Sequence, residues 1–134
     1  MNERFGKEYK LCSKKIIDEL FKTGRHIKSF PLRFIYKKKV LTTGQRFQVV
    51  ISVPKKRFKK APDRNRLKRL IREAVRKNKH ALESFLLQKD EQVALFLIYI
   101  GQEILTYAEI EAKIVKAFNR LIEELKSENN ISKS

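Results

Sequence analysis

The chain has 134 residues and a formal net charge of +17, because 32 Lys and Arg side chains outnumber 15 Asp and Glu. This length is most simply one domain over residues 1–134, and a hydrophobic content of 42% is enough for a core. Charge of this size repels itself in a compact chain, so it favours a polyanionic partner.

The charge is unevenly distributed along the chain. Residues 1–80 contain 26 basic and 6 acidic side chains, whereas residues 81–134 contain 6 and 9. We therefore expect the basic surface to lie in the first three-fifths of the chain. Residues 1–8 and 129–134 are predicted to be flexible, because they are polar and lack apolar periodicity.

Several classes of protein are disfavoured by the composition. The single cysteine, Cys12, allows neither an intramolecular disulfide nor a cysteine zinc site, which is typical of a reducing compartment. The N-terminal residues lack the apolar core of a signal peptide, and the longest apolar run, 93–100, is too short to span a membrane. We expect a cytoplasmic protein without a membrane partner.

The first half of the chain predicts one helix and at least two strands. Ser13 can cap a helix that runs to about Thr23, and Gly24 can end it. Residues 32–40 read as a strand, and either of its two alternating sets could face the core. Residues 42–44 form a turn, so this strand and the next predict a hairpin. The sequence does not decide whether a further short strand forms near residues 25–30.

The strand predicted at 46–53 has one apolar and one polar face. Phe47, Val49, Ile51 and Val53 alternate with Arg46, Gln48, Val50 and Ser52. The first set predicts the core side of the strand. The second set predicts an accessible side.

A very basic segment, residues 55–79, follows Pro54; 13 of its 25 residues are Lys or Arg. A link to residue 61 leads into a helix with Pro62 near its start and Asp63 as N-cap, ending near Lys79. Its apolar residues recur at helical spacing: Leu67, Leu70, Ile71, Ala74 and Val75. Its arginines, which suit bidentate phosphate contacts, lie on the other sides.

The last part of the chain completes an α+β pattern. Residues 81–87 predict either a short helix or an extension of the previous one. Residues 93–100 are apolar on both faces, which indicates a central strand. Thr106 and Glu109 have capping-box spacing and begin a long helix that we expect to fray after Glu128. The resulting order is helix, strand, strand, helix, strand, helix, a two-layer α+β sandwich.

The chain shows no pattern of an active site. His26 and His80 are far apart in sequence and lack neighbouring carboxylates, and the carboxylates near residues 109–111 and 123–124 read as a solvated helix face. Cys12 lacks an obvious base, and no phosphate-binding glycine loop is present. We therefore predict no catalytic residue and no metal site in this chain; catalysis would belong to a partner.

Aromatic residues suggest a second binding surface. Phe21, Phe34 and Tyr36 lie near the cationic run 37–39, and aromatic rings interleaved with cations hold single-stranded nucleic acid. Phe21 and Phe34 could equally be core residues. Tyr36, with its polar tip, is the better candidate for exposure.

Two motifs carry a family resemblance. Ser52-Val53-Pro54-Lys55-Lys56 is followed, after a spacer, by Arg64-Asn65-Arg66-Leu67-Lys68-Arg69 and then Arg72. This pattern resembles the signature of the protein subunit of bacterial ribonuclease P, and the resemblance extends over about residues 9–125. It implies a ribosomal protein S5 domain 2-like fold with a left-handed crossover, against the usual rule.

The resemblance also implies partners and sites. Members act with a large catalytic RNA to remove the 5′ leader of precursor tRNA, and Mg²⁺, held mainly by the RNA, takes part in the hydrolysis. No protein partner is required. The implied contacts to the catalytic RNA are Arg64, Asn65, Arg66, Lys68, Arg69, Arg72 and Arg76. The implied contacts to the leader are Phe21, Ile17, Tyr36, Gln48, Ser52, Lys55 and Lys56.

The sequence departs from the family pattern in two places. Ile17 stands where a further aromatic residue is frequent, and Val50-Ile51 where a glycine is common. Two other interpretations stay open from composition: a structural RNA-binding protein, such as a ribosomal protein, and a self-sufficient nuclease.

Overall fold

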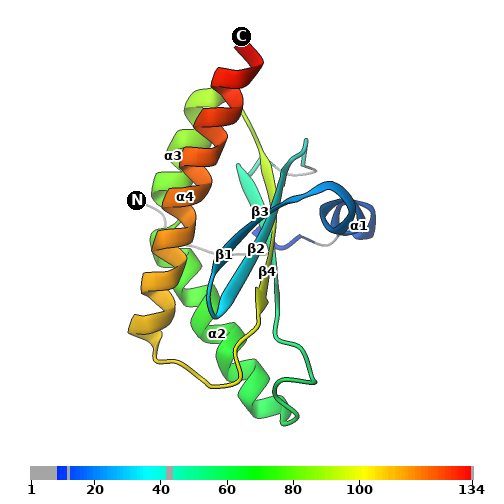
Figure 1. Cartoon of the computed structure of the whole chain (residues 1–134), viewed down its shortest axis with the longest axis vertical. Helices are drawn as coiled ribbons and strands as arrows, with labels where there is room; N and C mark the ends of the chain where they lie inside the picture. Colours follow the sequence, from blue (N-terminus) through cyan, green and yellow to red (C-terminus); the bar gives the residue numbers. More distant parts are fainter. Residues whose placement is uncertain (1–8, 12, 42–43, 134) are drawn as a thin grey trace.

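The computed structural model describes residues 9–11, 13–41 and 44–133, with side chains up to residue 128. The predicted flexibility of residues 1–8 falls outside this range. The elements in chain order (Figure 1) are α1 Lys14–Thr23, β1 Arg25–Ser29, β2 Leu32–Lys38, β3 Phe47–Ser52, α2 Ala61–Asn78, α3 His80–Lys89, β4 Val93–Tyr99 and α4 Tyr107–Lys133.

The sheet has the order β1-β2-β4-β3, which corrects one prediction. β2 pairs antiparallel with β1 and β4, and β3 pairs parallel with β4. The predicted hairpin between β2 and β3 is therefore wrong, because β4 lies between them. β4 is apolar on both faces and takes the position with a strand on each side. The short strand that the sequence left open is β1, and it forms the hairpin with β2.

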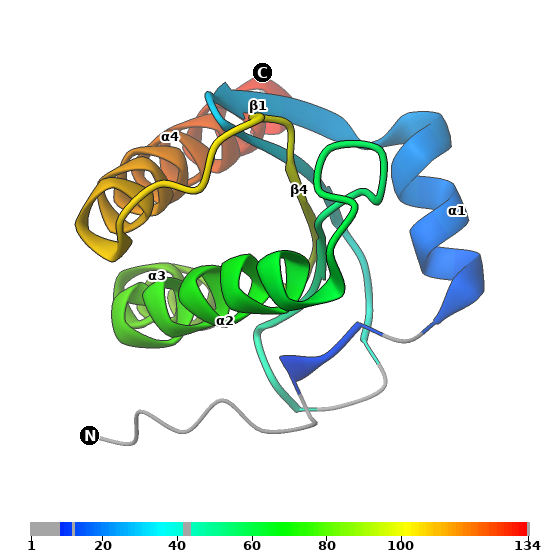
Figure 2. The same cartoon turned by 90° about the horizontal axis from the view of Figure 1, so that it is seen from below.

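The parallel pair requires a crossover, which α2 and α3 supply. With the carboxyl ends of the parallel strands β3 and β4 toward the viewer (Figure 2), the chain leaves β3, passes along the helical face and returns to β4 in the left-handed sense. Most such crossovers are right-handed. The α+β class and the unusual crossover are both as expected.

Helices cover both faces of the sheet, so β2 is buried on both sides. Phe34 and Tyr36 face the main core under α2 and α4, whereas Ile35 packs beneath α1 with Leu20 and Ala94. Figures 1 and 2 show α1 alone on its face and α2, α3 and α4 on the other. One face of the sheet is thus only partly covered.

The helix ends follow from local hydrogen bonds. Ser13 Oγ accepts the Ile16 N–H at 3.3 Å, which confirms the predicted cap of α1. The N-cap of α2 is Lys60 and not Asp63, because the Lys60 carbonyl already accepts the N–H groups of Asp63 and Arg64. Asp63 instead places its carboxylate in the first helical turn, where the helix dipole favours it.

The last part of the structure agrees with the elements predicted from the sequence, except for the end of α4. The Thr106–Glu109 capping box is present: Thr106 Oγ1 accepts the Glu109 N–H at 3.2 Å, and Glu109 Oε1 accepts the Thr106 N–H at 3.1 Å. The hydrogen bonds with Thr106 hold the pKa of the Glu109 carboxyl below its usual range. α4 continues to Lys133, beyond the expected end near Glu128.

Candidate nucleic-acid interface

α2 separates a buried stripe from a cationic surface. Leu67, Ile71, Ala74 and Val75 are fully buried, and Leu70 packs against the same core. The opposite side of the helix exposes Asn65, Arg66, Arg69 and Arg72, with Lys68 partly exposed. The predicted apolar stripe is therefore confirmed, and these five polar side chains are accessible to a polyanion.

Two of the predicted contact residues are already engaged within the protein. Arg64 Nη1 donates to the carbonyls of Phe58 and Lys59, at 2.8 and 2.9 Å, and so fixes the link before α2. Arg76 binds Glu73 through two hydrogen bonds, of 3.1 Å from Nε and 2.5 Å from Nη2. The guanidinium of Arg76 holds the pKa of Glu73 below its ordinary value.

Three other arginines of α2 differ from Arg64 and Arg76 in their hydrogen bonding. Arg66, Arg69 and Arg72 take part in no hydrogen bond or ion pair with any residue that the structure describes. Their guanidinium groups are therefore available for bidentate contacts with phosphate groups. Because Arg64 and Arg76 already serve the fold, these three arginines, together with the partly exposed Lys68, carry the available charge of this side of the helix.

A second surface lies on the partly covered face of the sheet, beside α1. The Phe21 ring is 53% exposed and packs edge-on against Phe96 of β4, with 4.8 Å between ring centroids. Ile17 is partly buried next to them and shares this cluster with Val50 and Ile98. The result is an accessible apolar platform between α1 and the sheet.

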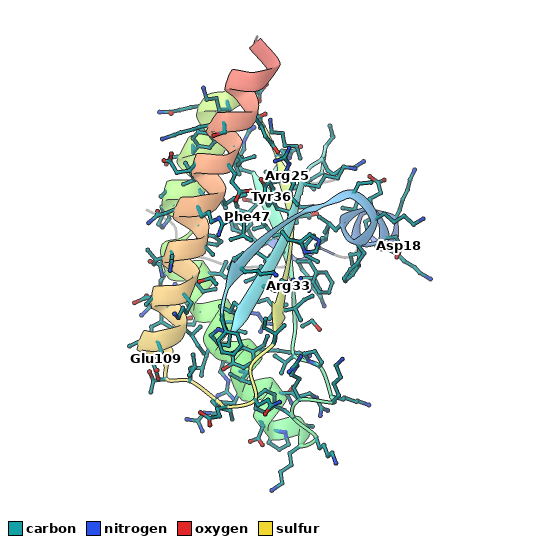
Figure 3. All side chains as sticks on the ribbon, in the orientation of Figure 1. Asp18, Arg25, Arg33, Tyr36, Phe47 and Glu109 are labelled. Atoms are coloured by element: carbon teal, nitrogen blue, oxygen red, sulfur yellow. The ribbon has the colours of Figure 1, made fainter. Side chains whose placement is uncertain are left out.

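Tyr36 does not belong to this platform, contrary to the prediction. Its side chain is 1% exposed and lies under α4, where its hydroxyl donates to Glu124 Oε1 at 2.9 Å. Neighbouring strand residues face opposite sides, so Ile35, packed beneath α1, forces Tyr36 to the other face. In Figure 3, Tyr36 and Phe47 lie on the α4 side, and Asp18 marks α1 beyond the other face.

Phe96 is the aromatic residue that the sequence interpretation missed. It lies opposite Ile35 of β2 and Val50 of β3, both of which face α1. The sequence did contain an indication of this position, because a strand that is buried on both faces directs alternate side chains to each face. Phe96 is the only aromatic residue in the α1-facing set of β4.

The other predicted leader contacts lie along β3 and beyond its end. Gln48 and Ser52 face α1 through their pairing with Ala94 and Ile98. Gln48 is only 6% exposed, so it is less accessible than expected, whereas Ser52 is partly exposed. Lys55 and Lys56 are exposed just after the strand.

Basic side chains border the open part of this face. His26 and Lys28 are exposed on β1, and alternation with the buried Ile27 places both on the α1 side. Arg33 of β2 pairs with Lys28 and Ile98 and is partly exposed on the same side. We name the surface formed by Ile17, Phe21, Phe96 and this basic border the α1 cleft.

Neither surface has the residues of a hydrolytic centre. Over residues 9–11, 13–41 and 44–128, no three His, Cys, Asp or Glu side chains gather at metal-binding distance. His26 faces the α1 side, whereas His80 begins α3 on the other face, so they do not form a nuclease pair. No helix in the described part of the chain is both long and apolar enough to cross a membrane.

Comparison with known proteins identifies the family. The family model described as Ribonuclease P matches residues 5–122. The chain belongs to the ribonuclease P protein family. It is 31% identical over 105 residues to the ribonuclease P protein component of Porphyromonas gingivalis, covering 78% of this chain and 77% of the relative. It is 40% identical over 75 residues to that of Chlorobium phaeobacteroides, covering 54% and 51%.

Solved structures support the same fold. The ribonuclease P protein of Staphylococcus aureus superposes with a TM-score of 0.64 at 19% identity, covering 86% of this chain and 96% of that one. The protein from Thermotoga maritima gives a TM-score of 0.65 at 21% identity, covering 83% and 96%.

Family membership decides between the open interpretations. As a ribonuclease P protein, the chain is a component of the ribonucleoprotein endonuclease of tRNA 5′ processing. Its RNA partner accounts for the net charge of +17. The interpretations as a ribosomal protein and as a self-sufficient nuclease are therefore set aside.

Proposed function

We propose that the chain binds the catalytic RNA through α2 and the single-stranded 5′ leader of precursor tRNA through the α1 cleft. The observation that carries this proposal is the separation of the two surfaces. Arg66, Arg69 and Arg72, which lack internal partners, lie on α2, whereas the exposed aromatic platform lies beside α1. One protein can therefore contact two RNAs at once.

The α2 surface suits a folded RNA. Arg66, Arg69 and Arg72 are arranged on a rigid helix that is anchored by its buried stripe, so their positions are fixed relative to one another. Such a helix contacts phosphates at set spacing and releases counterions when it binds. Asn65 and Lys68 extend the same surface, and Arg64 supports it by holding the link.

The α1 cleft suits an extended single strand. Bases stack on exposed aromatic rings regardless of their identity, and Phe21 supported by Phe96 provides such a ring. Ser52 can bond a base or a phosphate, while Lys55 and Lys56 neutralise the backbone at the end of the cleft. Ile17 contributes apolar contact but not a second ring.

The Mg²⁺ of the reaction is assigned to the RNA in this proposal. Magnesium in proteins is held by carboxylates, and the carboxylates described here do not form a cluster. When bound by the RNA, the ion supplies the activated water and neutralises developing charge. The contribution of the protein is to hold leader and catalytic RNA in place. We also propose that no further protein is required and that the complex works in the cytoplasm.

A three-part cleavage assay tests the proposal. Precursor tRNA is incubated with the chain alone, with a catalytic ribonuclease P RNA alone, and with both at low Mg²⁺. We expect no cleavage by the chain alone and a faster reaction with both components than with RNA alone. Cleavage without RNA, or no stimulation of the RNA, would contradict the proposal.

A further inference from the structure

A hollow of about 550 Å³ lies at the end of the sheet where β4 finishes. Its walls come from segments that are distant in sequence: the β1–β2 turn, the link before α2, the segment after β4 and the first turns of α4. All of these meet in the lower part of Figure 1. The platform of the α1 cleft does not contribute to these walls.

The most exposed aromatic ring of the described chain lies at this hollow. Phe30 is 67% exposed and contacts none of the other aromatic rings that the structure describes. The floor behind it is formed where Pro31 meets Gly101; a Cβ at Gly101 would lie 2.7 Å from Pro31 Cβ. Only glycine allows the turn and the segment after β4 to approach this closely. The ring is thus presented on a firm support.

Polar groups without internal partners lie beside the ring. The side chains of Arg57 and Gln102 make no hydrogen bond or ion pair with the residues that the structure describes. Both also line an adjoining hollow of about 510 Å³, to which Lys56 contributes. None of the described residues lining this second hollow is acidic, so it suits an anionic group.

The first hollow is also lined by charged side chains from the segment after β4 and from α4. Glu103, Glu109 and Lys113 line it, and the lowered pKa of Glu109 keeps that carboxylate ionised. Carboxylates disfavour a phosphate there but can accept hydrogen bonds from the amino groups of a base. The two hollows together therefore offer a place for a phosphate at Lys56 and Arg57, and for a base at Phe30.

We propose that these hollows bind one nucleotide of the 5′ leader beyond the part held in the α1 cleft. Lys55 and Lys56 follow β3 at the end of that cleft, so a strand that leaves the cleft there reaches Arg57 next. The base stacks on Phe30 and its phosphate lies at Arg57. This inference rests on the proposed function of the cleft and extends the path of the leader.

Leader length provides the test. The affinity of reconstituted holoenzyme is measured for precursor tRNAs with leaders of about four and about twelve nucleotides, lengths within the span of single-strand sites. The native chain is expected to bind the longer leader more tightly. Phe30→Ala should lower the long-leader affinity roughly 5- to 150-fold and leave the short-leader affinity unchanged.

Two further variants sharpen the result. Leu87→Ala removes a comparably exposed apolar side chain (61%) on α3 and should change neither affinity. Arg57→Gln keeps a polar, hydrogen-bonding side chain, although a shorter one, and removes the charge. It should flatten the log–log salt dependence of long-leader binding by about 0.7, and leave that of the short leader unchanged.

The outcomes separate this inference from the function on which it rests. If Phe30→Ala keeps the full long-leader affinity while Phe21→Ala weakens both leaders, the inference fails and the α1 cleft stands. If Phe21→Ala changes neither leader, the proposed function itself fails. If Phe30→Ala weakens binding of catalytic RNA without substrate, the hollow serves that RNA and the inference is overturned.

Discussion

Single residues on β2 and β4 show which aromatic side chains face α1 and which face α4. Tyr36 and Phe96 are both strand aromatics, yet one is buried under α4 and the other supports an exposed ring. Strand parity alone separates them, since Ile35 and Phe96 share the α1 side. The roles of the two aromatics should accordingly differ in mutants.

Tyr36→Phe is expected to affect stability and not RNA binding. It removes the 2.9 Å hydrogen bond to Glu124 without opening a cavity, so the free energy of unfolding should fall by about 1–2 kcal/mol. Urea denaturation measures this loss, and leader affinity should stay unchanged. Selective weakening of leader binding would place Tyr36 back in the interface.

The same residue predicts a pH dependence. Burial, together with the hydrogen bond to Glu124, raises the pKa of Tyr36 above its ordinary value of 10.0. The stabilisation by the neutral hydroxyl is thus fully present below pH 10 and is lost as the pH rises above it. Unfolding measured between pH 8 and about 11 should show a smaller decline in Tyr36→Phe than in the native chain.

Phe21→Ala should act in the opposite way. Because the ring is half exposed, its loss should cost little stability, but a stacked base contributes about 1–3 kcal/mol. Holoenzyme affinity for precursor tRNA should drop accordingly, whereas affinity for mature tRNA, which lacks the leader, should not change. Equal losses for both tRNAs would assign Phe21 to the core.

At the scale of elements, α2 divides its arginines between structure and binding. Arg64 and Arg76 are held by carbonyls and by Glu73, whereas Arg66, Arg69 and Arg72 lack such partners. The motif in the sequence does not distinguish these two groups. Only the structure shows which charges are available.

The triple change Arg66→Ala, Arg69→Ala and Arg72→Ala should weaken binding of the catalytic RNA. Each lost phosphate contact is expected to flatten the log–log salt slope by about 0.7–0.9. Filter binding over a range of salt concentrations measures the slope. Arg76→Ala is the matched control and should change it less, because Glu73 already occupies that guanidinium. An unchanged slope in the triple variant would exclude direct phosphate contact.

At the scale of the whole molecule, much of the fold could be predicted from the sequence. The stripe on α2, the cap of α1, the central β4 and the capping box before α4 all depend on local periodicity or local hydrogen bonds, which a sequence displays. The pairing of β3 depends on a distant strand. A local turn signal at residues 42–44 therefore misled the hairpin prediction, and β4 takes the place beside both strands.

The candidate site was predictable to a similar degree. The sequence motifs indicated the α2 arginines and Phe21 as candidate contacts. These residues lie on helices, so their prediction did not depend on how the strands pair. The face of Tyr36 and the role of Phe96 required knowing that α1 packs on Ile35 and Ala94, which is a tertiary contact. The hollow at Phe30 required even more, since four separate segments form it.

The central claim is that two RNAs contact two separate surfaces of one chain, and site-directed crosslinking tests it most directly. A photoreactive group is attached at Lys22→Cys, beside Phe21, or at Asn65→Cys on α2, each in a Cys12→Ser chain. In holoenzyme bound to precursor tRNA, position 22 should crosslink to the 5′ leader and position 65 to the catalytic RNA. Crosslinks from position 65 to the leader, or from position 22 to the catalytic RNA alone, would contradict the account.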